Sequence, residues 1–216
     1  MKLRRPLRTF AYVALATGLA LGAWVGVTLW RGDPITGAYA SYRQRGLAVK
    51  LDAATQRRAV PARAVVPAIY RVPAGKPWGR LVIPRIGINA VVVEGTQEGD
   101  LASGPGHYRL TSSPGHGRTV AIAGHRTTFG AWFRHIDSLR RGDRIVLQMP
   151  YGVFLYRVTG HRVVTPETWS VIANRGYDRL VLSACHPVYS ASHRWIVFAA
   201  LERQASRQPP VPAAPR

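Results

Sequence analysis

Eight short runs of apolar residues, many of them β-branched or aromatic, dominate the chain between Lys76 and Arg203. Runs of this length, bounded by Gly, Pro, Asp and other polar residues, are typical of β-strands. They occupy residues 79–84, 88–93, 119–123, 144–149, 152–158, 161–164, 180–187 and 195–201. Their spacing predicts an all-β domain, either a closed barrel or a sandwich, with only short helical inserts such as residues 131–136.

A stretch of 21 uncharged residues, 10–30, precedes this domain and follows four positive charges within the first eight residues. A helix of about 20 residues crosses the hydrocarbon core of a membrane. A buried core helix and a cleaved signal peptide are the alternatives, but a signal peptide has an apolar region of only about 7–15 residues and a small-residue cleavage site. Because the positive charges come first, the sequence predicts a cytoplasmic tail over 1–9, a single-pass anchor over 10–30 and an extracellular remainder.

The segments that flank the predicted domain differ from it in composition and in the spacing of their apolar residues. Residues 31–75 are rich in Ala, Arg and Pro, and weak helical spacing over 35–59 is interrupted by Gly37 and Gly46. We expect a frayed juxtamembrane helix within a flexible spacer. The globular domain is expected over 76–203, and the proline-rich residues 204–216 are expected to be disordered.

The chain is strongly basic, with 30 Lys and Arg against 10 Asp and Glu and a formal net charge of +20. The excess is spread along the whole sequence, which suits a polyanionic neighbourhood such as a membrane surface or an anionic cell wall. No signature of a nucleic-acid-binding module is present, and we expect no nucleic-acid partner. No set of Cys and His residues has the spacing of a zinc site, and the acidic residues Glu94, Glu98 and Asp100 do not suffice for calcium. We therefore expect no metal and no cofactor.

The only cysteine, Cys185, lies at the end of the apolar run 180–187 and cannot form an internal disulfide. A thiol is nucleophilic as the thiolate, so a working cysteine needs a basic or cationic partner. His125 follows the run 119–123 at a turn, and Arg194 opens the run 195–201, where it would face Cys185 from the next strand. A nucleophile, a proton carrier and an oxyanion donor are the minimal parts for acyl transfer through a thioester.

Each of these residues also has a plainer interpretation. A lone cysteine at a strand end is most often a small buried apolar residue. His125 is one of seven histidines, and an arginine such as Arg194 is usually solvated or part of a surface ion pair. His107, which precedes a strand without a partner nucleophile, is interpreted as structural, and Gly104-Pro105-Gly106 as a tight turn. Residue types and spacing alone do not single out a catalytic triad.

A series of short motifs occurs along the chain in the order Leu101-x-x-Gly104-Pro105-Gly106-His107-Tyr108, Pro114-Gly115, Ile122-Ala123-Gly124-His125-Arg126-Thr127, Leu139-x-x-Gly142-Asp143, Leu182-x-x-Cys185-x-Pro187 and Arg194. In their order and separations, these motifs resemble those of the sortase family. The segment Cys185-His186-Pro187-x-Tyr189-Ser190-Ala191-x-x-Arg194 most resembles class E sortases of high-GC Gram-positive bacteria. The resemblance covers roughly residues 78–201.

The resemblance implies an eight-stranded sortase-type β-barrel and an extracellular cysteine transpeptidase tethered by an N-terminal membrane helix. It implies that Cys185 attacks the Thr–Gly carbonyl of a C-terminal sorting signal, Leu-Pro-x-Thr-Gly or Leu-Ala-x-Thr-Gly. His125 would transfer protons, and Arg194 would hold the substrate backbone and the oxyanion. The implied partners are surface proteins that carry such a signal, a peptidoglycan-precursor amine of the lipid II type, and the membrane.

Three further positions are implied in substrate binding, namely Thr127, Phe129 and Ala184. Sortases usually have threonine at the positions of Val181 and Ala184. Class E members often have tyrosine at the position of Phe129, which is associated with a preference for alanine in the signal. The second residue of the signal, Ala or Pro, is therefore left open.

Two other functions fit parts of the sequence. A cysteine transpeptidase acting between peptidoglycan stems would resemble Ser-His-Gly-Cys-x-Arg around the nucleophile, whereas Cys185 follows Ser183 and Ala184. A non-enzymatic, membrane-tethered basic module that binds anionic cell-wall polymer would explain the charge of +20. It would not explain why Cys185, His125 and Arg194 all fall on sortase positions.

Overall fold

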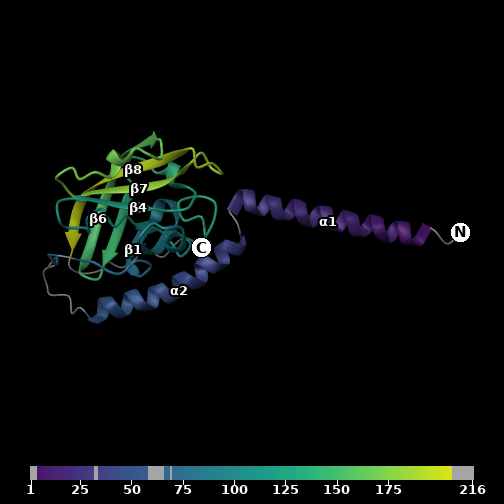
Figure 1. The fold of residues 1–216 in the computed structure, drawn as a ribbon, viewed down its shortest axis with the longest axis horizontal. Helices are drawn as coiled ribbons and strands as arrows, with labels where there is room; N and C mark the ends of the chain where they lie inside the picture. Colours follow the sequence, from purple (N-terminus) through teal and green to yellow (C-terminus); the bar gives the residue numbers. More distant parts are fainter. Residues whose placement is uncertain (1–3, 32–33, 58–65, 69, 206–216) are drawn as a thin grey trace.

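The computed structural model describes residues 4–31, 34–57, 66–68 and 70–205. Two helices, α1 (Arg4–Arg31) and α2 (Pro34–Arg57), precede a closed β-barrel of eight strands (Figure 1). In Figure 1, α1 projects away from the barrel, while α2 runs along one side of it. The closed barrel confirms the all-β, eight-stranded architecture expected from the sequence.

The strands follow one another around the barrel in the order β1-β2-β3-β4-β7-β8-β6-β5. Only β2 with β3 and β4 with β7 pair in parallel, and the other neighbours are antiparallel. The strand bounds are β1 Pro77–Ile83, β2 Ile88–Glu94, β3 Gly106–His107, β4 Thr119–Ala123, β5 Arg144–Met149, β6 Gly152–Val164, β7 Arg179–His186 and β8 His193–Ala205. The connections carry a short helix, α3 (Glu98–Leu101), and three 3-10 turns, η1 (Pro84–Ile86), η2 (Ile136–Ser138) and η3 (Trp169–Ile172).

The strand count agrees with the expectation, but two strands differ. The expected runs 152–158 and 161–164 form one long strand, β6, whose pairing with β8 shifts register between Val158 and Gly160. The short strand β3 has only two residues, too few to show any period in the sequence. The expected helical insert 131–136 is a series of turns that leads into η2.

Alternating side chains of the strands fill the barrel with one apolar core. Its largest fully buried members are Trp78, Leu81, Ile83, Ile122, Phe133, Ile136, Ile145, Leu147, Phe154, Tyr156, Leu180 and Leu182. A second cluster lies on the outer face of β4, β7 and β8, where Ala121, Val181 and Ile196 are buried under side chains that include Val171 and Ile172. The connection between β6 and β7 therefore covers these strands, which explains why their sequences are almost continuously apolar.

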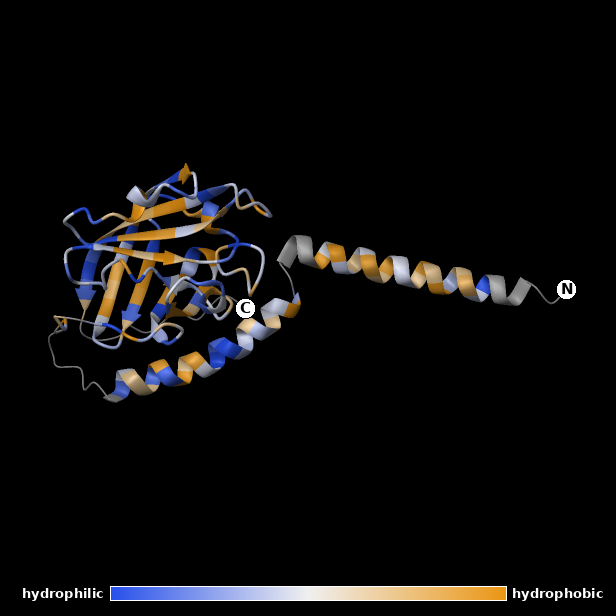
Figure 2. Ribbon diagram, viewed as in Figure 1, coloured by the Kyte–Doolittle hydropathy of each residue, from blue (hydrophilic) through white to orange (hydrophobic). Residues whose placement is uncertain are grey.

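In Figure 2, most of the coloured part of helix α1 has the orange or pale colours of hydrophobic and neutral residues. Its segment Arg8–Val27 is long and apolar enough to cross a membrane, and none of it is buried against the rest of the chain. The interpretation as a buried core helix is therefore excluded.

Helix α2 packs on the barrel, which differs from the frayed helix in a flexible spacer that we expected. Leu47 and Leu51 are buried against Val91 and Val93 of β2. Gln44 extends the sheet edge: its Nε2 donates to the carbonyls of Val91 (2.9 Å) and Ser103 (2.8 Å), and its Oε1 accepts from the Val91 N–H (2.7 Å). Residues 32–33, 58–65 and 69 of the expected spacer and residues 206–216 of the expected tail lie outside the described residues, whereas β8 continues to Ala205.

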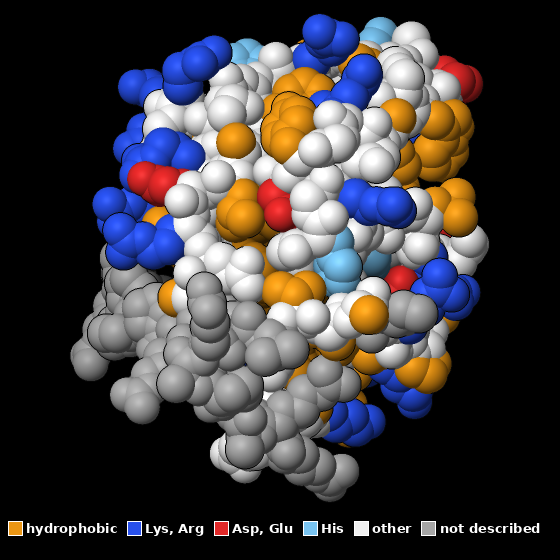
Figure 3. Space-filling view, turned by 90° about the vertical axis from the view of Figure 1, so that its left-hand side faces the viewer, with side chains coloured by type: hydrophobic (Ala, Val, Ile, Leu, Met, Phe, Trp, Pro, Cys, Tyr) orange, Lys and Arg blue, Asp and Glu red, His pale blue; other side chains and the backbone are white. Residues whose placement is uncertain are grey.

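Figure 3 shows how positive charge is distributed on one face of the molecule. On the face seen in Figure 3, Lys and Arg side chains are scattered and do not gather in a single patch. This agrees with the even spread of charge along the sequence.

We predict that Gln44→Ala destabilises the fold, because it leaves the buried backbone groups of Val91 and Ser103 without these partners. The free energy of unfolding should fall by roughly 2–3 kcal/mol, since each lost hydrogen bond costs about 1 kcal/mol and an unsatisfied buried group costs more. Thermal unfolding of the full chain in detergent, followed by near-ultraviolet circular dichroism, measures the change. Gln56→Ala, the same substitution at an exposed position of α2, is the control. Equal changes in both variants would contradict the docking role of Gln44.

Candidate active site

Strand pairing brings the three candidate catalytic residues to adjacent strand ends. In the parallel pair β4 and β7, Ala123 lies beside Ser183, and His125 and Cys185 each follow two residues later. In the antiparallel pair β7 and β8, Cys185 lies directly opposite Arg194. Residues separated by up to 69 positions in the chain thus come together at the neighbouring ends of β4, β7 and β8.

The thiol of Cys185 belongs to the outer face of β7. Leu182 and Ala184 point into the barrel core, and side chains alternate between the two faces of a strand, so Ser183 and Cys185 face outward. Cys185 is free and half-buried, and it is not sealed inside the barrel. Ala184, which the sequence assigned to substrate binding, is instead 3% exposed and packs in the core.

The imidazole of His125 is partly buried. Its Nε2 is buried and has no hydrogen-bond partner in the part of the chain that the structure describes. Burial lowers the pKa of His125 below its ordinary value of 6.5, and the negative charge of Glu98 on α3 opposes this shift to a lesser extent. The ring is therefore held mainly neutral at neutral pH, as a proton acceptor must be.

Phe129 forms one wall of this environment, with its ring centroid 5.4 Å from that of His125. The first turns of α2 support Phe129 from the other side: its N–H donates to Thr36 Oγ1 (2.8 Å), and Tyr39 meets its ring edge-on. Phe129 has a φ of 49°, a left-handed conformation that is costly for a residue with a Cβ. Contacts with α2 help to offset this strain. Thr127 lies half-buried in the same loop.

The guanidinium of Arg194 is tied to the loop between β7 and β8. Its Nη1 donates to the carbonyls of Ala191 (2.8 Å) and His193 (3.0 Å). Both bonds use one nitrogen of the planar fork, and the side chain also lines a groove beside the strand ends.

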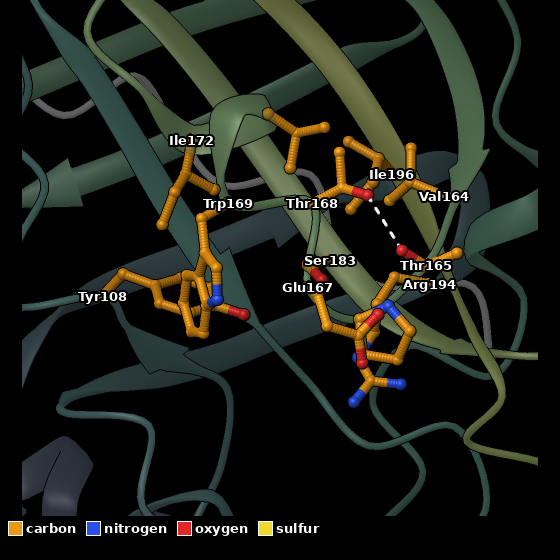
Figure 4. Close-up of a pocket in the computed structure, with 12 residues that line it drawn as sticks. Tyr108, Val164, Thr165, Glu167, Thr168, Trp169, Ile172, Ser183, Arg194 and Ile196 are labelled. Atoms are coloured by element: carbon orange, nitrogen blue, oxygen red, sulfur yellow. Dashed lines mark hydrogen bonds between the residues drawn. The ribbon is translucent and has the colours of Figure 1, made fainter.

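This groove, of about 300 Å³, lies on the outer face of β7 and β8 (Figure 4). Its lining is formed by Tyr108, Val164, Thr165, Pro166, Glu167, Thr168, Trp169, Val171, Ile172, Ser183, Arg194 and Ile196. In Figure 4, Tyr108 and Trp169 lie on one side of the view, with their rings in edge-to-face contact at 6.4 Å, and Arg194 lies on the other. A mostly apolar groove that ends at a cation suits an extended peptide with apolar side chains and backbone carbonyls.

Sequence reasoning missed most of the groove. Its residues come from the connection between β6 and β7, which has no regular hydrophobic period. One sequence feature could have indicated the groove: Trp169 is an aromatic residue in a polar segment. In the structure its side chain is 64% exposed. Thr127 and Phe129, by contrast, do not line the groove and lie on the His125 side of the site.

His107 has the surroundings of a structural residue. It is 3% exposed, and its ring stacks on Trp78 at 4.0 Å. Its Nδ1 pairs with Glu94 Oε2 at 3.0 Å, and its Nε2 lies 3.0 Å from the Ser112 carbonyl. The neighbouring turn is tight, because a Cβ at Gly106 would collide with the Gly95 carbonyl. Among the described residues, no group of three or more His, Cys, Asp or Glu side chains could hold a metal ion.

Comparison with known proteins gives a consistent result. A family model described as the sortase domain matches residues 81–202. The chain is 30% identical over 135 residues to Sortase D of Bacillus subtilis (61% of this chain, 67% of that protein). It is 34% identical over 119 residues to Sortase A of Bacillus anthracis (55% of this chain, 57% of that protein). The chain thus spans two thirds or less of the length of these relatives.

A solved structure of sortase E from Streptomyces avermitilis is also similar. It is 35% identical, with a TM-score of 0.58, and the alignment covers 67% of this chain and all of that chain. The likeness agrees with the class E resemblance seen in the sequence.

We predict that Phe129→Ala raises the pKa of His125 towards 6.5, because removing the ring admits water to the imidazole. An NMR titration of the imidazole protons in the full chain measures this pKa. The depressed pKa also means that the folded chain binds fewer protons than the unfolded chain, so stability should fall as the pH drops below about 6.5. Trp169→Ala, an aromatic deletion in the groove, is the control. An unchanged pKa in Phe129→Ala would show that the ring does not shield His125.

Proposed function

The chain belongs to the sortase family and is a sortase-type transpeptidase, and from that premise we propose the following reaction. It cleaves a C-terminal sorting signal of the type Leu-Pro-x-Thr-Gly or Leu-Ala-x-Thr-Gly between Thr and Gly, and it attaches the new carboxyl end to a cell-wall amine. The observation that carries the proposal is the register that aligns Cys185 with Arg194 and with the strand end before His125. An enzyme, rather than a module that only binds polymer, is the function that this geometry supports.

In the first half of the reaction, the Cys185 thiol gives its proton to His125, and Sγ attacks the carbonyl carbon of the signal threonine. The oxyanion that forms is stabilised by the Arg194 guanidinium, whose Nε and Nη2 are available to a substrate while Nη1 holds the loop. Collapse of this intermediate breaks the Thr–Gly C–N bond, and His125 donates a proton to the leaving glycine amine. The products are a thioester on Cys185 and a released C-terminal peptide.

In the second half, an acceptor amine attacks the thioester carbonyl and loses a proton to His125. The C–S bond then breaks, His125 passes this proton to Sγ, and both Cys185 and His125 return to their starting states. A bound amine reacts in place of water because it is held next to the carbonyl. Partial burial of His125, whose Nε2 is buried and has no partner among the described residues, limits the access of water and favours this exchange over hydrolysis.

The groove is the proposed site of the sorting signal. Its apolar wall and the aromatic pair Tyr108 and Trp169 suit the leucine end of the signal, while Arg194 faces the reacting end. Thr127 and Phe129 lie beside His125 and are proposed to contact the residues nearest the scissile bond.

We also propose the cellular setting. Helix α1 would be a single-pass anchor with a cytoplasmic N-terminus, because four positive charges lie within residues 1–8, at the start of its apolar segment. The barrel would then lie outside the membrane, where surface proteins with sorting signals and peptidoglycan-precursor amines of the lipid II type are available. Cys185 is the only cysteine of the sequence and has no partner for an internal disulfide, which is consistent with a role as a nucleophile.

We predict that Cys185→Ala abolishes both cleavage of a fluorogenic sorting-signal peptide and transfer to an added amine. Arg194→Ala should lower kcat/KM by about 100- to 1000-fold, the usual effect of losing an oxyanion donor. The assay uses peptides with Pro and with Ala at the second signal position, which also decides between the two signals. Normal turnover by Cys185→Ala would exclude the mechanism.

We predict that Trp169→Ala raises KM for the peptide about tenfold and leaves kcat within about twofold, because the ring contacts the substrate far from the reacting bond. Steady-state kinetics of the full chain measure both constants. Leu110→Ala, which removes a 95% exposed apolar residue that does not line the groove, is the control. A loss confined to kcat in Trp169→Ala would mean that the groove is not the site of the leucine end.

A further inference from the structure

Arg126 directly follows the candidate base His125 and has the features of a buried structural cation. Its side chain is 2% exposed. Its Nη2 forms an ion pair with Asp137 Oδ2 at 2.6 Å and donates to the Arg134 carbonyl at 3.2 Å. These two bonds fasten the guanidinium to the loop that follows β4.

The other half of the guanidinium reaches the strand that carries the nucleophile. Nη1 lies 3.4 Å from the carbonyl oxygen of Cys185 and 3.3 Å from His186 Nδ1. The planar fork thus bridges the end of β7 and the loop after β4. The parallel ladder between β4 and β7 ends at the pair Ala123 and Ser183. It therefore does not extend to His125 and Cys185, which lie two residues further along.

A buried guanidinium is costly to desolvate and persists only where several acceptors satisfy it. Three of its four acceptors here are backbone carbonyls or a carboxylate in segments next to the site. The rigid five-donor fork of arginine can serve acceptors on both segments at once, which a lysine ammonium cannot do in the same geometry.

We propose that Arg126 is a positioning residue that sets the separation of the Cys185 thiol and the His125 imidazole. It acts through the Cys185 carbonyl on one side and through Asp137 and the Arg134 carbonyl on the other, and it touches neither the substrate nor the reacting atoms. The inference rests on the proposed roles of Cys185 and His125.

The matched control is Arg157, which also combines an ion pair with a bond to a backbone carbonyl. It pairs with Glu202 and donates to the Gly142 carbonyl at 2.8 Å, on strands β6 and β8 and outside the groove lining. Arg157→Gln therefore removes a comparable set of bonds from the barrel wall without touching either strand end of the site.

The first experiment measures kcat and KM for the sorting-signal peptide with the full chain in detergent. Arg126→Gln and Arg126→Lys should each lower kcat by about 10- to 100-fold with KM within about twofold, since misplacing reacting groups by about 1 Å costs a factor of this size. Asp137→Asn should lower kcat in the same direction by a smaller factor. Values of kcat within twofold of wild type for both Arg126 variants, or an equal loss in Arg157→Gln, would overturn the proposal.

The second experiment needs no peptide and tests the coupling directly, because Cys185 is the only cysteine. In the wild-type background, His125→Ala should slow alkylation of Cys185 by iodoacetamide at pH 7 by about tenfold. In the Arg126→Lys background, His125→Ala should change the rate by less than about twofold, because the imidazole no longer reaches the thiol. The same His125 effect in both backgrounds would overturn the positioning role.

The two experiments separate this inference from the proposed function. A chain that alkylates as expected but cleaves no sorting peptide would contradict the proposed substrate and keep the role of Arg126. If Arg126→Gln does not fold, Arg126→Lys and Asp137→Asn decide, because Asp137 is 41% exposed and its change to Asn preserves shape.

Discussion

The site depends above all on the two pairings of β7, parallel with β4 and antiparallel with β8. A slip of one residue in either ladder would turn every side chain of the strand to the opposite face. Leu182 and Ala184 would then leave the core, and Cys185 would enter it. Because the core holds the register so firmly, the position of the thiol relative to Arg194 follows from the packing of residues that take no part in the chemistry.

The second condition is exclusion of water on the outer face of the same strands. The cluster of Ala121, Val181 and Ile196 makes this face a second apolar layer, and the connection between β6 and β7 closes over it. Polar groups that reach such a layer interact strongly, and their protonation is sensitive to burial. Burial has such effects next to this layer: it lowers the pKa of His125. Both Nη atoms of the buried Arg126 have acceptors, whereas its buried Nε has none among the described residues.

Helix α2 connects the candidate membrane anchor to the site itself. Gln44, Leu47 and Leu51 dock its middle on β2, and its first turns contact Phe129 through Thr36 and Tyr39. The segment expected to act as a spacer therefore forms part of the wall around His125. A helix that docks on the domain along its length transmits the position of the preceding segment more directly than a flexible linker would.

The sequence by itself determined the strand-rich domain, the apolar N-terminal helix and the identity of the three candidate catalytic residues, because these depend on local period, length and motif. It did not reveal β3, because two residues are too few to show a period. It did not reveal the continuity of β6, because the pair Thr159 and Gly160 is typical of a turn between two strands. It did not reveal the docking of α2, because the weak apolar stripe of this helix can be interpreted only when its contacts with β2 are known. The motif predicted that Ala184 binds the substrate, whereas the alternation of side chains along β7 points the Ala184 side chain into the core. Only the tertiary structure decided the groove, the partial burial of His125 and the bridge made by Arg126, since each requires segments far apart in the chain to meet at fixed distances, and no local pattern encodes that separation.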